Sequence, residues 1–352
     1  MKRKQLFIFS LEPLESRYTK EWFTHLPATL GCRLFGFDVV SINGTTLSGK
    51  PTEGAFLDFS ATNLWKNEQM WSFFDAFRGG DIADDAVLLF TDAWNPCILQ
   101  VKYTKDLLKK NWKIISIWHA GSYIAEDPLG QLIPDKAWSL ASERAFFEAS
   151  DINVFASVDH IRRFVNAFPG INKSKILRSG FPMEYINVIP FPKVEKKNQV
   201  LFGARLSPEK QPDIFDALSV LLPEYDFVAP LRDPNPTKEK YWKALAESKV
   251  AVWFSTLETL GIGQYEALAI NTTPLVPNRL CYPEQYPKGS PFVYPSEWAE
   301  NPETADLPKL ARLIKDQVEN HEAFTQDRYK AYMHQKCNFF SADILIDTIN
   351  NL

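Results

Sequence analysis

The sequence predicts an α/β protein built from two Rossmann-like, doubly wound domains. Apolar runs that are typical of buried parallel strands recur along the chain, for example at 86–90 and 250–254. Segments with helical spacing separate these runs, so strands and helices alternate in both halves, which indicates parallel sheets covered by helices. The 352 residues are enough for two domains of common size.

Composition and charge exclude several classes of protein. A formal net charge of −4 argues against a uniformly basic nucleic-acid binder, although a local basic cleft stays open. The four cysteines are scattered, and neither they nor the five histidines show metal-ligand spacing, so we expect no metal and a cytoplasmic protein. The apolar run after the basic start is broken by Glu12 and Glu15, which favours a first strand over a signal peptide. No apolar run is long enough to insert into a membrane.

The most informative stretch is a predicted βαβ unit at 250–277. Glu258 falls in the loop after its first strand, and Glu266 falls eight positions later, inside the predicted helix. Gly261 and Gly263 lie between the two acids and let a ligand approach the backbone closely. Free amides at the helix start favour an anion. The stretch therefore predicts an anion pocket between two carboxylates, which suits a phosphorylated sugar.

A family resemblance rests on these residues. Glu258-x7-Glu266, followed by Ala267-Leu268-Ala269 and a Pro-Leu-Val strand, resembles the motif of retaining glycosyltransferases with the GT-B fold, most of all family four. Upstream, Arg205 and Lys210 follow the strand 200–202, and in the resembling family this pair holds the donor diphosphate. Arg offers phosphate a planar fork and Lys a point charge. The alternative for the two acids is a pair of solvated residues at a helix start. Taken alone, the two cations are better explained as ordinary surface residues, but acids and cations together favour a donor site.

The resemblance implies two domains facing across a cleft and sugar transfer, with retention, from a nucleotide diphosphate-sugar, in particular a UDP-sugar. Glu266 would bind the ribose hydroxyls, and Glu258 the sugar hydroxyls. No Asp-x-Asp stands at a strand end, so we expect neither an obligatory metal nor another cofactor. The predicted donor-site residues are Arg205, Lys210, Glu258, Leu260, Gly261, Ile262, Gly263 and Glu266. The predicted catalytic residues are Arg205, Lys210, Glu258 and His119.

Polar residues also follow two predicted strands of the first half. Since open α/β sheets place ligands at the carboxyl ends of their strands, these residues are candidates for the acceptor side. They are Asp92, Trp94, His119 and Ser122. A turn or N-cap role for Asp92 and a packed or orienting His119 are open alternatives. The first loop carries Glu12-Pro13-Leu14-Glu15 in place of the Gly-x-Gly-x-x-Gly fingerprint, which argues against a dehydrogenase.

Three segments of the first half resemble phage-encoded glycosyltransferases, some of which modify hydroxymethylated pyrimidines in DNA. The segments are LEPLESRYTKEWF, LFTDAWNP and IWHAGSYIAEDPLG. This resemblance implies modified double-stranded DNA as the acceptor and the host cytoplasm as the location. Basic runs at 102–113, 160–163 and 193–197 are compatible with it, although such runs are usually solvated helix faces. We expect a locally positive cleft face, with aromatic neighbours such as Trp94 and Trp112, to which some of the following cations contribute: Lys102, Lys105, Lys109, Lys110, Arg162 and Arg163.

The expected organisation is a first domain over 1–187, a Pro- and Lys-rich linker over 188–198, a donor domain over 199–335 and a terminal helix over 336–352 that packs back on the first domain. Three alternatives to a DNA-modifying enzyme remain: a glycosyltransferase acting on a surface glycan or small metabolite, a sugar-nucleotide epimerase of the same fold, and a catalytically silent binding protein.

Overall fold

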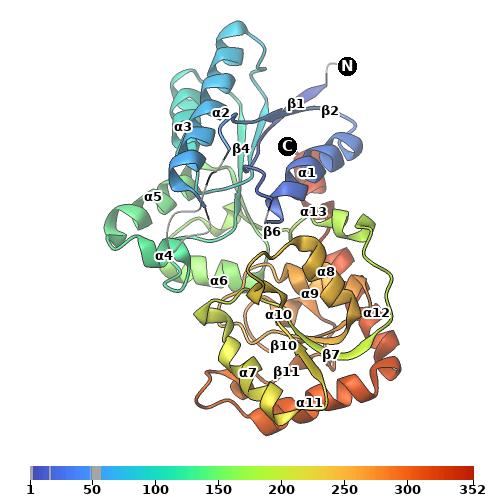
Figure 1. The fold of residues 1–352 in the computed structure, drawn as a ribbon. Coiled ribbons are helices and arrows are strands. Elements are labelled where there is room, and N and C mark those ends of the chain that lie inside the picture. The colour runs from blue at the N-terminus through green and yellow to red at the C-terminus, as the bar shows by residue number, and fades with distance from the viewer. Residues whose placement is uncertain (1–2, 16, 48, 50–56) are drawn as a thin grey trace. The chain divides into compact units, whose positions relative to one another are not determined.

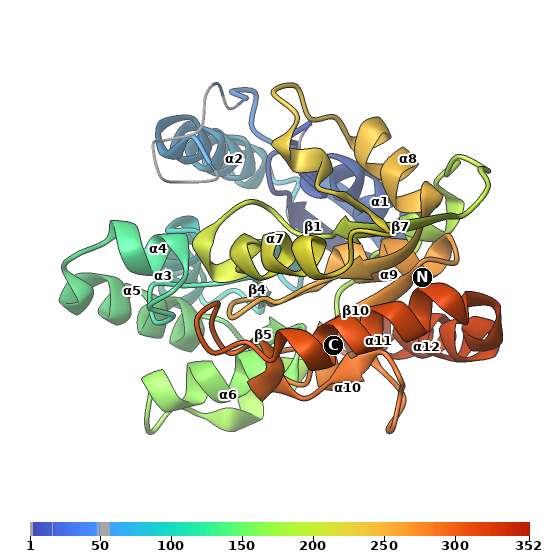
Figure 2. The same cartoon turned by 60° about the horizontal axis from the view of Figure 1, so that its bottom comes forward.

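The structure, a computed structural model, describes residues 3–15, 17–47, 49 and 57–352. It divides into two compact units: unit 1 comprises Met1–Tyr185 and Ser341–Leu352, and unit 2 comprises Ile186–Phe340. Each unit has a parallel sheet with helices on both faces (Figures 1 and 2). The prediction of two Rossmann-like, doubly wound domains is therefore confirmed. Ser16, in the first of the three phage-like segments, lies outside the described residues.

Unit 1 contains six parallel strands in the order β2-β1-β3-β4-β5-β6. The strands are β1 (Lys4–Phe9), β2 (Phe37–Ile42), β3 (Val87–Phe90), β4 (Lys113–Trp118), β5 (Ile152–Phe155) and β6 (Ile176–Arg178). The helices are α1 (Thr19–Arg33), α2 (Phe59–Gly79), α3 (Cys97–Leu107), α4 (Pro128–Leu132), α5 (Lys136–Ala149), α6 (Val158–Ala167) and α13 (Asp343–Asn350). Because β1 lies between β2 and β3, the strand order reverses at β1 and β3, where such sheets bind ligands.

Unit 2 contains five parallel strands in the order β8-β7-β9-β10-β11. The strands are β7 (Lys197–Phe202), β8 (Asp226–Val228), β9 (Ser248–Val252), β10 (Thr273–Pro277) and β11 (Val293–Tyr294). The helices are α7 (Pro212–Leu221), α8 (Lys238–Glu247), α9 (Ile262–Ala269), α10 (Tyr282–Gln285), α11 (Leu307–Glu319) and α12 (Thr325–Asn338). Here the order reverses at β7 and β9, the strands that precede the two motif loops.

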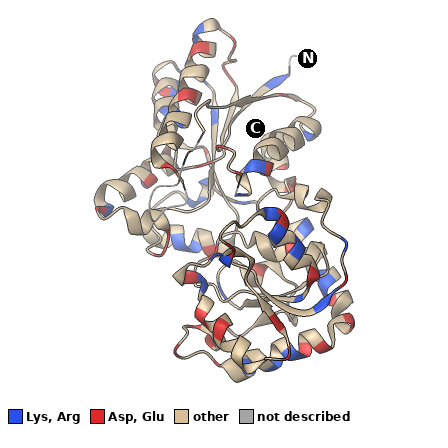
Figure 3. Cartoon of the chain, viewed as in Figure 1, with Lys and Arg blue, Asp and Glu red and all other residues tan. Residues whose placement is uncertain are grey.

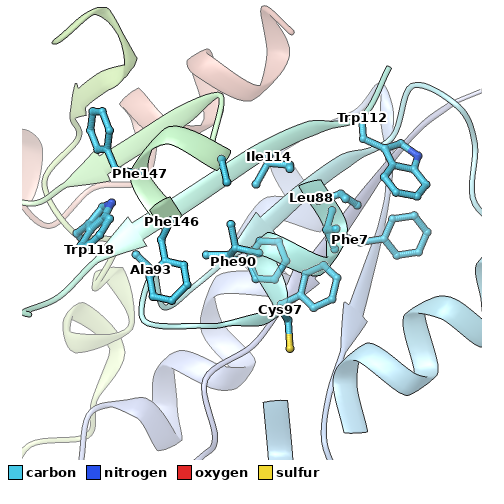
Figure 4. Close-up of a cluster of buried hydrophobic side chains, with 14 of the residues drawn as sticks. Phe7, Leu88, Phe90, Ala93, Cys97, Trp112, Ile114, Trp118, Phe146 and Phe147 are labelled. Carbon is cyan, nitrogen blue, oxygen red and sulfur yellow. The ribbon is translucent and has the colours of Figure 1, made fainter. Parts of the chain in front are cut away.

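Aromatic side chains fill the core of unit 1 (Figure 4). Trp112 is fully buried there, edge-on to Phe73 and Phe77 with ring centroids 5.5 and 5.1 Å apart, and its indole N–H donates to the Ala83 carbonyl at 2.9 Å. The prediction that Trp112 lies on the positive cleft face is therefore wrong. Its apolar area and its satisfied N–H make it a core residue.

The last helix of the chain, α13, belongs to unit 1. Asp343 at its start pairs with Arg33 of α1. The amide of Ala342 donates to one oxygen of Glu184, whose other oxygen lies 2.8 Å from His25 Nε2. These contacts tie the two ends of unit 1 together. Among the described helices, none combines the length and the apolar character that a membrane span requires.

Unit 1 also buries a histidine whose ring nitrogens bond no carboxylate among the described residues. His160 in α6 is 1% exposed, and its Nε2 accepts a hydrogen bond from the Tyr123 hydroxyl. Its Nδ1 has no partner among the described residues, and the Phe155 ring lies edge-on at 5.1 Å. Burial lowers the pKa of His160 to about 3, so this side chain is neutral in the folded protein.

We predict that protonation of His160 destabilises unit 1 in acid. The unfolded chain binds a proton here at about pH 6.5, whereas the folded chain does so only near pH 3, so stability is lost as pH falls through that window. Gln at this position keeps the hydrogen-bond acceptor but does not titrate. The melting temperature of His160→Gln should therefore fall less steeply than that of the wild type between pH 6.5 and 4. His334→Gln in α12 is the control, and equal slopes for all three proteins would contradict the prediction.

Candidate functional site

The reversal point of the unit 2 sheet brings the two motif loops together. The loop 203–210 follows β7 and the loop 253–261 follows β9, so both leave the same edge of the sheet at neighbouring strands. The amide of Thr256 donates to the Glu209 carbonyl at 2.8 Å and joins the loops directly. The sequence signals that were read separately therefore form one site, at the position where doubly wound sheets bind ligands.

An ion pair stands at the centre of this site. Lys210 Nζ lies 3.1 Å from Glu258 Oε2 and also donates to the Leu257 carbonyl. The Lys210 side chain is 7% exposed and that of Glu258 is 22% exposed, so the pair is largely removed from water. A short 3-10 turn, Pro208–Lys210, directs the lysine into the β9 loop.

The second oxygen of Glu258 is bound by backbone amides. Oε1 accepts from the amides of Thr259, Leu260 and Gly261 at 3.2, 3.3 and 3.1 Å. Burial acts to raise the pKa of Glu258, but Lys210 and these amides outweigh it and hold the pKa below its ordinary value. In this conformation the Glu258 carboxylate is bound to the backbone amides that directly precede α9. The sequence assigned that position to a phosphate.

Arg205 shares the first loop with Lys210 but lies apart from the ion pair. Its side chain is 59% exposed, and its guanidinium is 3.4 Å from Glu209 Oε1. Glu209 in turn accepts from the Ser207 hydroxyl at 2.6 Å. The structure thus places Arg205 at the surface of the same loop, where the contact with Glu209 is weak and exposed.

Glu266 lies on α9, partly buried, and its Oε1 accepts from the indole N–H of Trp242 at 3.0 Å. Trp242 belongs to α8 and packs edge-on against Phe191, with ring centroids 5.6 Å apart. The indole therefore fixes the orientation of the carboxylate. No local pattern singled out Trp242, because α8 and α9 meet only in the folded unit.

Glycine is required at the two positions of the Glu-x7-Glu segment for different structural reasons. Gly261 has a positive φ of 62° and caps α9, a conformation that favours glycine. A Cβ on Gly263 would lie 3.0 Å from the Tyr241 hydroxyl and 3.3 Å from the Trp253 ring. A Cβ on Gly203, in the other loop, would lie 2.2 Å from the same ring. Close packing around Trp253 thus accounts for Gly203 and Gly263 without a ligand.

In unit 1, a second ion pair lies beside the reversal point. Lys66 of α2 lies 2.9 Å from Asp92, which follows β3, and Asp92 also accepts from the amide of Trp94 at 3.1 Å. Burial acts to raise the pKa of Asp92, but Lys66 outweighs it, so the pKa lies below its ordinary value. Sequence reasoning missed Lys66, although Asp58 is a helix N-cap residue by type and does cap α2.

His119 is held by the protein through both of its ring nitrogens. Its Nε2 lies 2.6 Å from the Thr91 carbonyl, which only accepts, so Nε2 donates; Nδ1 then accepts from the Tyr18 hydroxyl at 2.9 Å. Burial lowers the pKa of His119 and raises that of Tyr18 to about 12. The neutral ring packs edge-on against Trp22 and Phe181. This geometry favours the orienting alternative for His119.

Glu143 of α5 joins the other two acceptor-side candidates. It is fully buried and accepts from the Trp94 indole at 2.6 Å, the Ser122 amide at 2.5 Å and the Ser122 hydroxyl at 3.0 Å. Burial raises the pKa of Glu143 against the effect of these bonds. The structure therefore brings Asp92, Trp94 and Ser122 into one network. A buried acid inside a helix gives no sequence signal, which is why it was missed.

The six cations do not form the positive face that was expected on unit 1. Five of the six pair with acids of the same unit: Lys102 with Asp106, Lys105 with Asp151, Lys110 with Asp84, and Arg162 and Arg163 with Asp159. Figure 3 shows the two signs of charge interspersed along these helices. Asp84 and Asp151 precede β3 and β5, so Lys105 and Lys110 lie at the amino edge of the sheet, opposite the edge expected to bind a ligand.

The basic run 102–113 also changes structure along its length. The helix α3 ends at Leu107, Lys109 has a positive φ of 51°, and Lys113 begins β4. A single solvated helix face is therefore not formed either. Among the described residues, no group of three or more His, Cys, Asp or Glu side chains is arranged to hold a metal ion.

Comparison with known proteins identifies the fold. No protein-family model matches the sequence, and no curated protein matches it. Solved structures match over nearly the whole chain. Sucrose-phosphate synthase from Thermosynechococcus elongatus is 12% identical with a TM-score of 0.65, covering 99% of this chain and 98% of that one. The catalytic domain of starch synthase IV from Arabidopsis thaliana, bound to ADP and acarbose, is 11% identical with a TM-score of 0.66, covering 100% and 98%.

A third similar structure is Anabaena HepE in complex with UDP-glucose, which is 12% identical with a TM-score of 0.59 and covers 99% of this chain and 100% of that one. At these identities the likeness concerns the fold. It confirms that the chain has the GT-B fold, with two parallel-sheet α/β domains.

We predict that Gly203→Ala destabilises unit 2, because its new methyl group would collide with Trp253 where the β7 loop leaves the sheet. Overpacking of this kind costs about 1–3 kcal/mol. A double variant that also carries Trp253→Phe should regain part of the lost stability, because the smaller ring leaves room for the methyl group. Gly31→Ala in α1, where nothing lies within 4 Å of the new Cβ, is the control. Thermal unfolding measures the effect, and a Gly203→Ala protein as stable as this control would show that the packing is not tight.

Proposed function

We propose that the chain is a glycosyltransferase that binds a nucleotide diphosphate-sugar at the reversal point of unit 2. The observation that carries the proposal is the cradle made by Lys210 and the amides of residues 259–261, in which a carboxylate already sits. Solved structures of the same fold include one in complex with UDP-glucose and one bound to ADP, which supports a nucleotide-sugar donor.

In this proposal the donor competes with Glu258 for its partners. A diphosphate carries negative charge that Lys210 and the three amides bind as they bind the carboxylate. Once displaced, Glu258 is free to accept hydrogen bonds from the sugar hydroxyls. The carboxylate thus preserves the cradle in the absence of donor and recognises the sugar in its presence.

The chemical step breaks the bond between the anomeric carbon and the diphosphate oxygen, and forms a bond from that carbon to the acceptor oxygen. The electron pair leaves with the diphosphate oxygen, and that oxygen takes up the proton that the acceptor hydroxyl gives up. Lys210 and Arg205 stabilise the charge that develops on the leaving oxygen, the main electrostatic demand of this step. Arg205 is exposed and weakly held by Glu209, so it can turn onto the bound donor. Retention of configuration rests on the resemblance of the Glu258 and Glu266 motif.

Glu266 is assigned to the ribose hydroxyls, which a carboxylate binds well as a double acceptor. The indole of Trp242 uses one of its oxygens and holds the group in place. This division gives each motif residue a different part of the donor: Lys210 and Arg205 the diphosphate, Glu258 the sugar, and Glu266 the nucleoside.

The acceptor is assigned to the carboxyl edge of the unit 1 sheet, around Asp92, Trp94, His119 and Ser122. His119 acts there by orientation, since both ring nitrogens are bonded to the protein. Modified DNA as the acceptor rests on the three phage-like segments alone, because the cations expected to support it are paired with local acids. A surface glycan or a small metabolite is the alternative class.

We predict that Lys210 is the dominant cation for the donor. Lys210→Met should weaken binding of a nucleoside diphosphate by about 1.5–3 kcal/mol, which is roughly 10- to 150-fold in Kd. Arg205→Ala should weaken binding less but should slow transfer. Calorimetric titration with UDP, followed by single-turnover kinetics in EDTA, separates the two effects.

Two further variants control this experiment. Lys249→Met removes a lysine on β9 that bonds Asn198 and should bind normally. Lys210→Met/Glu258→Gln removes both charges, so it folds without an unpaired buried carboxylate. Unchanged UDP affinity in both Lys210 variants would disprove the proposal that Lys210 and the amides of residues 259–261 bind the diphosphate.

We predict opposite behaviour for the two glutamates. Glu258→Gln should bind free UDP at least as tightly as the wild type, because the internal competitor for Lys210 has lost its charge. It should lose the additional affinity for UDP-glucose, since its hydroxyl acceptor is weakened. Glu266→Gln should weaken the binding of UDP and of UDP-glucose to a similar extent, because both ligands contain the ribose that Glu266 is proposed to bind. If Glu258→Gln weakens UDP as strongly as it weakens UDP-glucose, the displacement model is wrong.

A panel of nucleotide sugars tests the reaction class and the acceptor together. Each is incubated with hydroxymethylated DNA, with a glycan mixture or with no acceptor, and products are read by mass spectrometry. Transfer to DNA that weakens steeply with salt would support a polyanionic acceptor, because bound counterions are released from phosphate. Conversion of a donor without acceptor would indicate an epimerase. If none of the donors is converted, the remaining alternative is a catalytically silent binding protein.

A further inference from the structure

A second hollow lies at the opposite edge of the unit 2 sheet, with a volume of about 660 Å³. Its walls come from the Pro-rich segment 186–196, from the last residues of α8 and α9, and from Tyr332 of α12. The strands β7, β9 and β10 begin at this edge, whereas the Lys210–Glu258 pair lies where β7 and β9 end. The hollow is therefore separate from the proposed donor site, and all of its lining residues belong to unit 2.

The lining combines an apolar wall with hydrogen-bond donors. Ile189, Phe191 and Ile270 are among its apolar residues, and its polar side chains are Asn187, Lys193, Lys196, Asn271 and Tyr332. None of the residues that line it is an Asp or a Glu. Such a surface disfavours a cation and leaves room for an apolar body.

Lys196 is the polar group with the clearest unmet capacity. Its ammonium donates to the Ser248 carbonyl at 2.9 Å and to the Thr272 hydroxyl at 2.5 Å, so one of its three N–H groups has no acceptor among the described residues. Burial and the nearby Arg328 lower the pKa of Lys196 to about 7. The folded protein thus keeps this amine where its charge is poorly compensated.

Arg328 adds a second cation, which is buried and on which the carboxylate of Glu322 acts without forming an ion pair. Arg328 is 1% exposed and donates to Asn271, which lines the hollow, and to the Thr273 hydroxyl and the His321 carbonyl. Neither Arg328 nor Lys196 lies within ion-pair distance of a carboxylate in the described part of the chain. The carboxyl-terminal ends of α8 and α9 supply about half a negative charge each, and Glu322 acts on Arg328, so Lys196 is the cation whose charge is least compensated.

Asn187 supplies further donors on the same side. Its Oδ1 accepts from the hydroxyls of both Tyr265 and Tyr332, each at 2.7 Å. This fixes the amide orientation, and the two N–H groups of Nδ2 have no acceptor among the described residues. Donors without acceptors, uncompensated positive charge and an apolar wall share one hollow.

We propose that this hollow binds a small organic carboxylate with an apolar body, its carboxylate paired with Lys196 and its apolar part against Ile189, Phe191 and Ile270. The ligand balances the charge of Lys196 and uses the free donors of Lys196 and Asn187. Burying the apolar part supplies the remaining affinity. None of the residues that line the hollow is assigned to the donor or to the acceptor, so the proposal holds whether or not the proposed function is correct.

The experiment uses the full chain and the fluorescent probe 1-anilinonaphthalene-8-sulfonate, an apolar anion whose emission rises in an apolar site. We expect saturable binding that octanoate displaces and that octanol, which lacks the charge, displaces far less. UDP should not displace the probe. Displacement of the probe by UDP, or equal displacement by octanoate and octanol, would overturn the proposal.

Variants locate the binding. Lys196→Met should weaken octanoate by about tenfold or more, as expected for the loss of a charge-assisted bond. Ala269→Phe should block binding by filling the hollow while leaving Lys196 in place, which keeps the test decisive if the first variant folds poorly. Lys249→Met, on the strand β9 but outside the lining, is the matched control. Wild-type octanoate affinity in Lys196→Met or in Ala269→Phe would disprove the site.

Discussion

The ion pair between Lys210 and Glu258 is the interaction on which the proposed site depends. Two charges that are largely removed from water cost several kcal/mol each to desolvate, and only close geometry and additional hydrogen bonds offset that cost. Here the three amides at the start of α9 and the Leu257 carbonyl supply those bonds. Loss of either partner would leave the other charge buried, so the loops after β7 and β9 share one stable arrangement.

The two units share a sheet topology but use their reversal points differently. In unit 2 the β9 loop leads into the amide start of α9 beside a lysine, which makes an anion cradle. In unit 1 the same position is covered by α2, whose Trp65 and Gln69 both donate to the Ser10 carbonyl. Lys66 from the same helix neutralises Asp92. The proposal that the donor binds to unit 2 therefore rests on the chemistry of the edges and not on the fold.

Local patterns predicted those parts of the fold and the site that local chemistry decides. The βαβ unit around Glu258 followed from two apolar strands with a helical segment between them, and α9, expected from about Gly261 to Ile270, spans Ile262–Ala269. Partners distant in sequence were out of reach: Lys66 and Asp92 are 26 positions apart, and Glu143 is 49 from Trp94. No local sequence pattern showed that the Glu258 carboxylate would accept from the amides of residues 259–261, or that the Arg205 side chain would stay exposed.

The same limit explains why counting charges along the chain located the wrong surface. Lys105 and Lys110 stand in the strongest basic run, yet each meets an aspartate that precedes a strand, because the amino edge of the sheet gathers those loops. The weak run 193–197 behaves differently. Lys197 pairs with Glu247, but Lys196 turns inward and, within the described part of the chain, donates to neutral acceptors only, near the buried cation Arg328. Positive charge that matters for binding is charge left uncompensated after folding, and only the contacts of each side chain show where that is.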